Sequence, residues 1–194
     1  MILYNGPTSP FGRLARVVSL ELGSAVEERI IDVYSATFLD GLNPLRQIPT
    51  LVLDDGQAIH DSRVICAYLD SVSGRPTLYP EAERWAVEIR AALAIGAMEA
   101  GLLRRMELNR PAGEQSPSTI AKLEQRIDRA TDGLERAAEE IAAGALRIDQ
   151  IATACALEYA DLRYTPDWRR RCTALAAWLA GFAERPAMVA TRPR

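Results

Sequence analysis

The stretch 47–66 combines residue types that bind polar ligands with the signals of a tight hairpin. A short apolar run at 50–53 leads into a turn that contains Gly56, and a second short run follows it. Glycine favours such a turn because it tolerates the positive φ that tight hairpins need. Asp61 and Ser62 come next and open a segment whose apolar residues have helical spacing. The pattern predicts two strands and a helix.

The two element starts in this stretch carry the candidate ligand contacts. Ile48 and Pro49 precede the first predicted strand, and Asp61 and Ser62 stand where the helix begins. If these starts lie side by side, an open backbone edge meets the N–H groups of a helix N-terminus, which favour anions. The stretch therefore suits a peptide-like ligand that bears a carboxylate.

A hydroxyl marks a third element start, near the N-terminus. The apolar run 2–4 predicts a first strand, and the residues after it predict a helix with Ser9 as N-cap and Pro10 at the first helical position. Gly23 is predicted to end this helix. On the residues alone, a chemical role for the Ser9 hydroxyl and a role as helix cap only are equally supported.

Elements that would position these residues follow in order along the first part of the chain. Residues 27–33 predict a second strand, and the order strand, helix, strand implies a right-handed parallel βαβ unit. Residues 34–46 predict an irregular stretch or a short helix. The turn-rich residues 73–80 predict a linker. We therefore expect an α/β domain over residues 1–75.

Strand signals are absent after the linker. One helix is predicted to end at Pro111, the next to run from Ser116 to Gly144, and the last to start near Trp168 and end before Pro186. The segment 149–162 is apolar on most sides, which is typical of a helix in the middle of a domain. We therefore expect an all-helical domain over residues 82–194.

Composition restricts the partners. The chain has 194 residues and a formal net charge of −3, which argues against nucleic acid and anionic membranes as partners. No apolar run approaches the roughly 20 residues that span a bilayer, and no signal peptide is evident. The three widely spaced cysteines predict buried free thiols rather than disulfides or a zinc site. We expect a cytoplasmic protein without a metal.

These motifs, in this order and spacing, resemble the cytosolic glutathione S-transferases, and the resemblance covers essentially the whole chain. The matching residues are Ser9-Pro10-Phe11 with Arg13 nearby, Asn43-Pro44 ahead of Gln47-Ile48-Pro49, Asp61-Ser62, and the run 151–157. The chain looks most like the bacterial members that carry Ser-Pro-Phe at the start of the first helix.

The resemblance implies a thioredoxin-like first domain that holds glutathione. Gln47, Ile48 and Pro49 would bind the tripeptide, with Pro49 in a cis peptide bond and the residue before it pairing with the cysteinyl backbone. Ser62 would bind the carboxylate at the γ-glutamyl end, and Asp61 would hold the ammonium group. The physics agrees, because a helix N-terminus favours negative charge.

The resemblance also implies a role for Ser9 as a hydrogen-bond donor to the glutathione sulfur. A donated O–H bond and the positive helix end would both favour the thiolate, which is the nucleophile. Thr8 and, less directly, Tyr4 are alternative hydroxyl donors. Relatives with cysteine at this position act as thiol transferases or dehydroascorbate reductases, and the serine here disfavours that branch.

The second domain would supply the wall of a site for an apolar electrophile, with Phe11, Met98 and Arg105 as candidate contacts. A homodimer is implied in the same way. The expected activity is glutathione transfer to apolar electrophiles, as in detoxification. The alternatives are a binding or regulatory protein of this fold without turnover, or an enzyme that uses glutathione for dehalogenation, ether cleavage or isomerisation.

One position departs from the family pattern. The family usually has Ser or Thr at the start of the buried helix and Asp three residues later, which together form a capping box. Here Arg147 and Gln150 occupy those positions. Gln150 can close one half of the box, but an arginine side chain cannot accept the N–H bond of the other half. The start of this helix is therefore expected to be held differently or less firmly.

Overall fold

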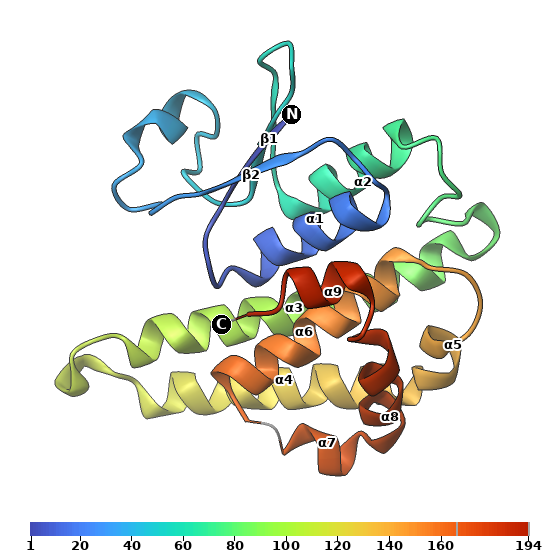
Figure 1. Cartoon of the computed structure of the whole chain (residues 1–194). Helices are drawn as coiled ribbons and strands as arrows, with labels where there is room; N and C mark the ends of the chain where they lie inside the picture. The colour runs from blue at the N-terminus through green and yellow to red at the C-terminus, as the bar shows by residue number, and fades with distance from the viewer. Residues whose placement is uncertain (166, 194) are drawn as a thin grey trace. The chain divides into compact units, whose positions relative to one another are not determined.

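The computed structural model describes residues 1–165 and 167–193, and it divides the chain into two compact units (Figure 1). The first unit comprises Met1–Leu78 together with Pro186–Arg194, and the second comprises Tyr79–Arg185. This division departs from the predicted one at the C-terminal end, because the predicted helical domain ran to residue 194. The guanidinium of Arg13 supplies a reason: it donates to the Met188 carbonyl (3.4 Å) and to the Thr191 hydroxyl (3.3 Å).

The first unit is a four-stranded sheet with helices, in the thioredoxin-like arrangement that was predicted. Its elements are β1 (Ile2–Asn5), α1 (Pro10–Glu21), β2 (Glu27–Ile30), a 3₁₀ turn (Thr37–Gly41), β3 (Thr50–Val52), β4 (Ala58–Ile59), α2 (Ser62–Val72) and α9 (Pro186–Ala190). The strand order is β2-β1-β3-β4, with β1 parallel to β2 and antiparallel to β3, and with β3 antiparallel to β4. Helices α1 and α2 pack against each other.

Local signals account for the boundaries of these elements. Ser9 caps α1 and Pro10 is its first residue, and Gly23 (φ +68°) follows its end. Gly56 (φ +89°) makes the turn between β3 and β4. Strand β2 ends at Ile30, earlier than the predicted 27–33, because its partner β1 ends at Asn5 and leaves the next residues without a ladder.

Helices make up the second unit. They are α3 (Arg84–Leu108), α4 (Pro117–Arg136), α5 (Ala138–Ala142), α6 (Ile148–Arg163), α7 (Trp168–Arg171) and α8 (Thr173–Phe182), with short 3₁₀ turns at Glu81–Glu83 and Ala112–Glu114. Helix α3 packs along both α4 and α6. Helix α6 is buried on most sides, as predicted. Within the described residues 1–165 and 167–193, no helix has the length and apolar character needed to cross a bilayer.

Two helices that were predicted to be continuous are each divided in two. The first breaks at Ala137, whose backbone leaves the helical region (φ −105°, ψ 16°), and the second breaks at Cys172. A contact from another helix explains the second break: the Glu135 carboxylate accepts the N–H groups of Ala174 and Leu175, each at 2.9 Å. An acidic side chain of α4 thereby caps α8, and no local pattern reveals such a cap.

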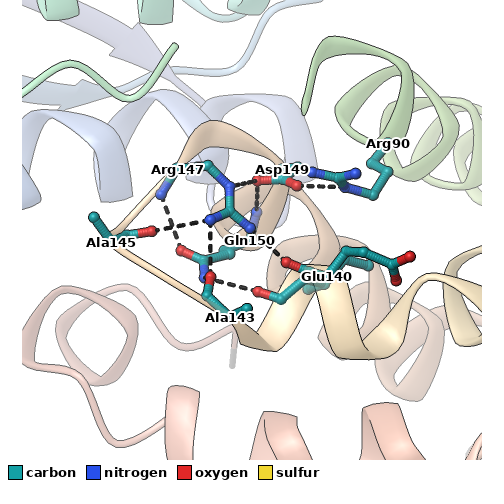
Figure 2. Close-up of polar contacts among 8 residues, drawn as sticks. Arg90, Glu140, Ala143, Ala145, Arg147, Asp149 and Gln150 are labelled. Carbon is teal, nitrogen blue, oxygen red and sulfur yellow. Dashed lines mark hydrogen bonds and ion pairs between the residues drawn. The ribbon is translucent and has the colours of Figure 1, made fainter. Parts of the chain in front are cut away.

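The start of α6 is held by a buried polar cluster rather than by the usual capping box (Figure 2). The Gln150 side chain accepts the Arg147 N–H at 2.9 Å, which closes the half of the box that the sequence allowed. The Arg147 guanidinium instead donates to the carbonyls of Glu140 (2.6 Å) and Ala143 (2.8 Å), so it caps the end of α5. The departure from the family pattern is therefore compensated by contacts across the turn.

Asp149 supplies the negative charge of this cluster. Its carboxylate is fully buried and lies 2.6 Å from Arg90 Nε on α3 and 3.3 Å from Arg147 Nε. It also accepts the N–H of Gln150 at 3.0 Å. One carboxylate thus pairs with two largely buried guanidinium groups and links the first turn of α6 to α3.

Candidate functional site

Three loops of the first unit lie at one end of the sheet, where strands begin or end. Tyr4 of β1 pairs with Thr50 of β3, and Leu51 of β3 pairs with Ile59 of β4. Because both pairs are antiparallel, the end of β1, the start of β3 and the end of β4 lie at the same end of the sheet. The predicted site residues flank these strand ends: Ser9 follows β1, Ile48 and Pro49 precede β3, and Asp61 and Ser62 follow β4.

The first two of these loops are in direct contact at Gly6. A Cβ atom added to Gly6 would lie 2.6 Å from Ile48 Cδ1 and 4.0 Å from Ser9 Cβ. The Ser9 N–H donates to the Gly6 carbonyl at 3.3 Å, which folds the loop back before α1 begins. Ser9 and Ile48 therefore lie on either side of the same glycine.

The Ser9 hydroxyl is part-exposed at the start of α1. Its oxygen accepts the Gly12 N–H at 3.1 Å, the bond expected of an N-cap. Accepting this bond uses a lone pair and leaves the O–H proton, for which residues 1–165 and 167–193 provide no acceptor. Helix capping and donation to a ligand are thus compatible roles for Ser9.

Asn43 holds the loop that leads into β3. Its side-chain amide donates to the Gln47 carbonyl (3.0 Å) and to the Thr50 hydroxyl (3.1 Å), while its oxygen accepts the Leu45 N–H (3.0 Å). Thr50 in turn donates to the Gln47 carbonyl at 2.9 Å. Both Asn43 and Thr50 are buried. In the sequence, Asn43 served only as part of a motif, and its role in holding this loop was missed. The signal that could have indicated the role is a polar residue directly before Pro44.

The Ile48–Pro49 peptide is cis, as the resemblance implied. The His60–Asp61 peptide is also cis, which the sequence did not suggest. Gln47 is exposed, Ile48 is half-buried and Pro49 is buried. Gln47 and Ile48, the two residues before the buried proline, are therefore the ones that a ligand can reach.

At the start of α2, the two polar residues divide their tasks. Asp61 is the N-cap, and its Oδ1 accepts the N–H groups of Arg63 (2.9 Å) and Val64 (3.5 Å). Ser62 is the first helical residue, so its N–H has no acceptor within the helix. The residue as a whole is only 3% exposed, and the described residues offer its hydroxyl no hydrogen-bond partner. Capping needs Asp61 alone, and the donors of Ser62 remain available at a helix N-terminus that favours anions.

Beneath Ser9, the side chain of Asn5 fixes the end of β1. It accepts the Gly6 N–H at 2.8 Å and donates to Glu28 at 2.8 Å, and it is buried against the first turn of α1. A Cβ atom on Gly12 would lie 1.5 Å from Asn5 Oδ1. Gly12 is therefore required because Asn5 occupies the space of its side chain, a contact that sequence reasoning missed.

Gly12→Ala is expected to destabilise the first unit by about 1–3 kcal/mol, since the added methyl group displaces Asn5 and its hydrogen bonds. Thermal unfolding measures the loss. The control is Gly41→Ala in the same unit, because a Cβ atom there meets nothing within 4 Å. Equal unfolding temperatures for the two variants would contradict the proposed contact.

The remaining candidate residues occupy different surroundings. Thr8 and Phe11 are part-exposed, whereas the Tyr4 ring packs on Phe38 with centroids 5.0 Å apart. In the second unit, Met98 is fully buried and Arg105 is exposed.

The three cysteines are buried, and burial raises the pKa of the Cys172 thiol to about 11, with nearby Glu135 and Asp132 acting in the same direction. No cluster of three or more metal-ligating side chains occurs in the described part of the chain.

Comparison with known proteins agrees with this geometry. Residues 3–77 match the family model described as the glutathione S-transferase N-terminal domain. Over 177 residues the chain is 33% identical to the uncharacterized GST-like protein YibF of Escherichia coli (strain K12). The matched region covers 87% of this chain and 86% of YibF.

Two solved structures show the same fold in complexes. Both are of a glutathione transferase family member from Pseudomonas fluorescens Pf-5 that is 37% identical to this chain. The complex with glutathione has a TM-score of 0.95 and covers 100% of this chain and 98% of the other; the complex with S-(propanoic acid)-glutathione has a TM-score of 0.90 and covers 100% of both. The extent of identity to YibF shows that the chain belongs to the glutathione S-transferase family.

Proposed function

We propose that the protein is a glutathione transferase that binds glutathione at this end of the sheet in the first unit and promotes attack of its thiolate on an apolar electrophile. The observation that carries the proposal is that three loops lie together there. Each offers one group to a ligand: the Ser9 hydroxyl, the Ile48 backbone and the donors of Ser62. The bound glutathione in the family member from Pseudomonas fluorescens supports this choice of ligand.

Each contact has a separate task in this proposal. The backbone of Ile48, with Gln47 and Pro49 beside it, pairs with the peptide backbone of glutathione, as a free strand edge does. Ser62 donates to the γ-glutamyl carboxylate, and the exposed Asp61 carboxylate holds the ammonium group. The Ser9 hydroxyl donates to the sulfur and favours the thiolate, which is the reactive form. Phe11 of the first unit and Met98 and Arg105 of the second are the candidate contacts of the electrophile.

Ser62→Ala is expected to weaken glutathione binding about tenfold or more, because a hydrogen bond to a charged group contributes about 1.5–3 kcal/mol. Calorimetric titration with glutathione measures the affinity. Ser71→Ala is the matched control, since Ser71 lies on the same helix and, among the described residues, its hydroxyl bonds only to the Tyr68 carbonyl. An affinity that is the same in Ser62→Ala and in the wild type means that Ser62 serves the helix alone.

The decisive experiment for the activity is a rate measurement with glutathione and a panel of electrophiles: activated alkenes, aryl halides, alkyl halides and aryl ethers. Conjugation of alkenes or aryl halides supports a transferase, and selective turnover of alkyl halides or ethers assigns a dehalogenase or an etherase instead. An isomerase is detected by following unsaturated ketones without net loss of glutathione. Binding without turnover in every assay identifies a binding or regulatory protein, because a fold alone does not establish catalysis.

The proposal includes a homodimer in the cytoplasm and membership of the bacterial Ser-Pro-Phe type. Trp85 and Ile89, one turn apart on α3, are 73% and 67% exposed and form an apolar strip that a second copy would cover. The three buried cysteines suit a reducing compartment. Sedimentation analysis tests the dimer, and Trp85→Arg is expected to shift the protein to the monomer.

A further inference from the structure

Helices α3 and α6 of the second unit run side by side in a constant register. Arg90 Nε contacts Asp149 near their starts (2.6 Å), and Arg104 Nη1 donates to the Arg163 carbonyl near their ends (2.9 Å). Both pairs are separated by 59 residues, so the two helices are parallel and stay in step between these contacts. Side chains on the facing sides of the two helices are therefore close to one another between these contacts.

Tyr159 occupies one of these meeting points. A Cβ atom on Gly101 of α3 would lie 3.0 Å from Tyr159 Cε1, so the ring of α6 packs directly on a position without a side chain. One turn further along each helix stand Arg105 on α3 and Arg163 on α6. The Tyr159 phenol thus faces two arginines, one from each helix.

The two guanidinium groups interact with this phenol. Burial acts on the pKa of the Tyr159 hydroxyl in one direction, and the positive charges of Arg163 and Arg105 act in the other. Burial outweighs them and raises that pKa above its ordinary value. Because the phenol stays neutral at pH 7, it remains a donor, and the three side chains carry two positive charges.

Neither arginine has an acidic partner within residues 1–165 and 167–193. Arg104, the neighbour of Arg105, pairs with Glu124 at 2.7 Å, whereas Arg105 and Arg163 make no ion pair with any described carboxylate. Arg163 Nε is in addition buried without a hydrogen-bond partner among those residues. A buried donor on a cation is costly to leave unpaired, so this group is available to an incoming anion.

We propose that Tyr159, Arg163 and Arg105 form a carboxylate-binding site for the second substrate, so that the preferred electrophile has an apolar body and a carboxylate. That the bound carboxylate belongs to the electrophile rests on the proposed function. That an anion binds here rests only on the residues of α3 and α6. A carboxylate accepts several hydrogen bonds, and a guanidinium presents its donors in a fork that matches both oxygens. An uncharged electrophile would leave the Arg163 donor unpaired.

A matched pair of activated alkenes tests the preference: monomethyl fumarate, which carries a carboxylate, and dimethyl fumarate, in which an ester masks it. In each reaction the glutathione thiolate forms a bond to an alkene carbon, the electron pair moves onto the ester carbonyl as an enolate, and a proton from water completes the thioether. Rates are expressed as enhancement over the uncatalysed reaction, so that the different reactivities of the two alkenes cancel.

Arg163→Gln and Arg105→Gln are expected to lower the enhancement for monomethyl fumarate about tenfold or more, since bonds to charged groups contribute about 1.5–3 kcal/mol. The enhancement for dimethyl fumarate should change less than about twofold, because the ester has no charge to pair. Arg129→Gln is the control: it removes the same charge from an exposed position on α4 of the same unit. Equal losses for both alkenes overturn the proposal.

Direct binding separates this site from the catalytic proposal. Benzoate and methyl benzoate are titrated into the protein without glutathione, and calorimetry should detect benzoate alone, with at least tenfold weaker binding in Arg163→Gln. If no electrophile is turned over while benzoate binds in this way, the catalytic proposal fails and the carboxylate site stands. If turnover occurs but benzoate does not bind, the carboxylate site is wrong and the transferase remains.

Discussion

Replacing Asp149 by alanine is expected to lower the free energy of unfolding of the helical unit by about 3–5 kcal/mol. The fully buried carboxylate is the counter-charge for Arg90 and for Arg147, whose side chains are 14% and 7% exposed. Removing it leaves two cations in a region with little water, and the cost of an uncompensated buried charge exceeds the net value of the pair. The first turn of α6 also loses the bond to the Gln150 N–H.

An exposed pair on α3, the helix that carries Arg90, provides the control for Asp149→Ala. Arg84 and Glu88 form an ion pair one turn apart, with side chains 50% and 36% exposed, so Glu88→Ala should cost no more than about 0.5 kcal/mol. Urea unfolding followed by tryptophan fluorescence reports on this unit, because all three tryptophans of the chain lie in it. Both variants are compared at one protein concentration, since association would shift the transition.

Losses that agree within about 1 kcal/mol for the two variants would contradict a central role for the Asp149 cluster. A double variant adds a second test. Arg90→Met combined with Asp149→Asn removes both partners of the closest pair and should recover part of the stability lost in Asp149→Ala, since replacement of a buried pair is often nearly neutral.

The first unit could be predicted from the sequence because its boundaries depend on local signals. Ser9 and Pro10 set the start of α1, Gly56 sets the hairpin turn, and Asp61 sets the start of α2. Each signal acts within a few residues of its own position. The strand ends that these signals fix are also the loops that carry the candidate site, so its residues could be named before the sheet order was known.

Contacts between distant residues account for what the sequence did not predict. The break before α8 depends on Glu135 of α4, and the attachment of residues 186–194 to the first unit depends on Arg13. The sequence suggested a weak start to α6 at Arg147, yet the guanidinium caps the preceding helix and Asp149 balances its charge. In each case an acceptor or a charge from another element supplies what the local pattern lacks.

Ser9→Ala is expected to lower the rate of glutathione transfer at pH 7 by about 10–100-fold while changing the affinity for glutathione much less. A thiol with an ordinary pKa of about 8.5 is mostly protonated at pH 7, and donation from the Ser9 hydroxyl would lower that pKa by favouring the thiolate. Without the donor the pKa returns toward its ordinary value. The loss of rate should therefore be largest at neutral pH and shrink above pH 9, where the thiolate forms unaided.

The control for Ser9→Ala must separate the donor from the helix cap. Alanine removes both, and loss of the cap alone costs about 1 kcal/mol of stability, whereas glycine retains most of the capping effect. Ser9→Gly should therefore reproduce the loss of rate with little loss of stability, and Ser9→Thr should retain the rate because it keeps the hydroxyl. Thr8→Ala tests the neighbouring hydroxyl.

The absorbance of the thiolate in the ultraviolet, followed against pH with glutathione bound, gives a reading that does not depend on any electrophile. In Ser9→Gly the titration should move to higher pH by about 1–2 units, the shift that a lost charge-assisted bond of about 1.5–3 kcal/mol produces. An unshifted titration in Ser9→Gly combined with a shift in Thr8→Ala would transfer the role to Thr8. No shift in either variant would leave Ser9 as a helix cap and assign activation of the sulfur to the helix N-terminus alone.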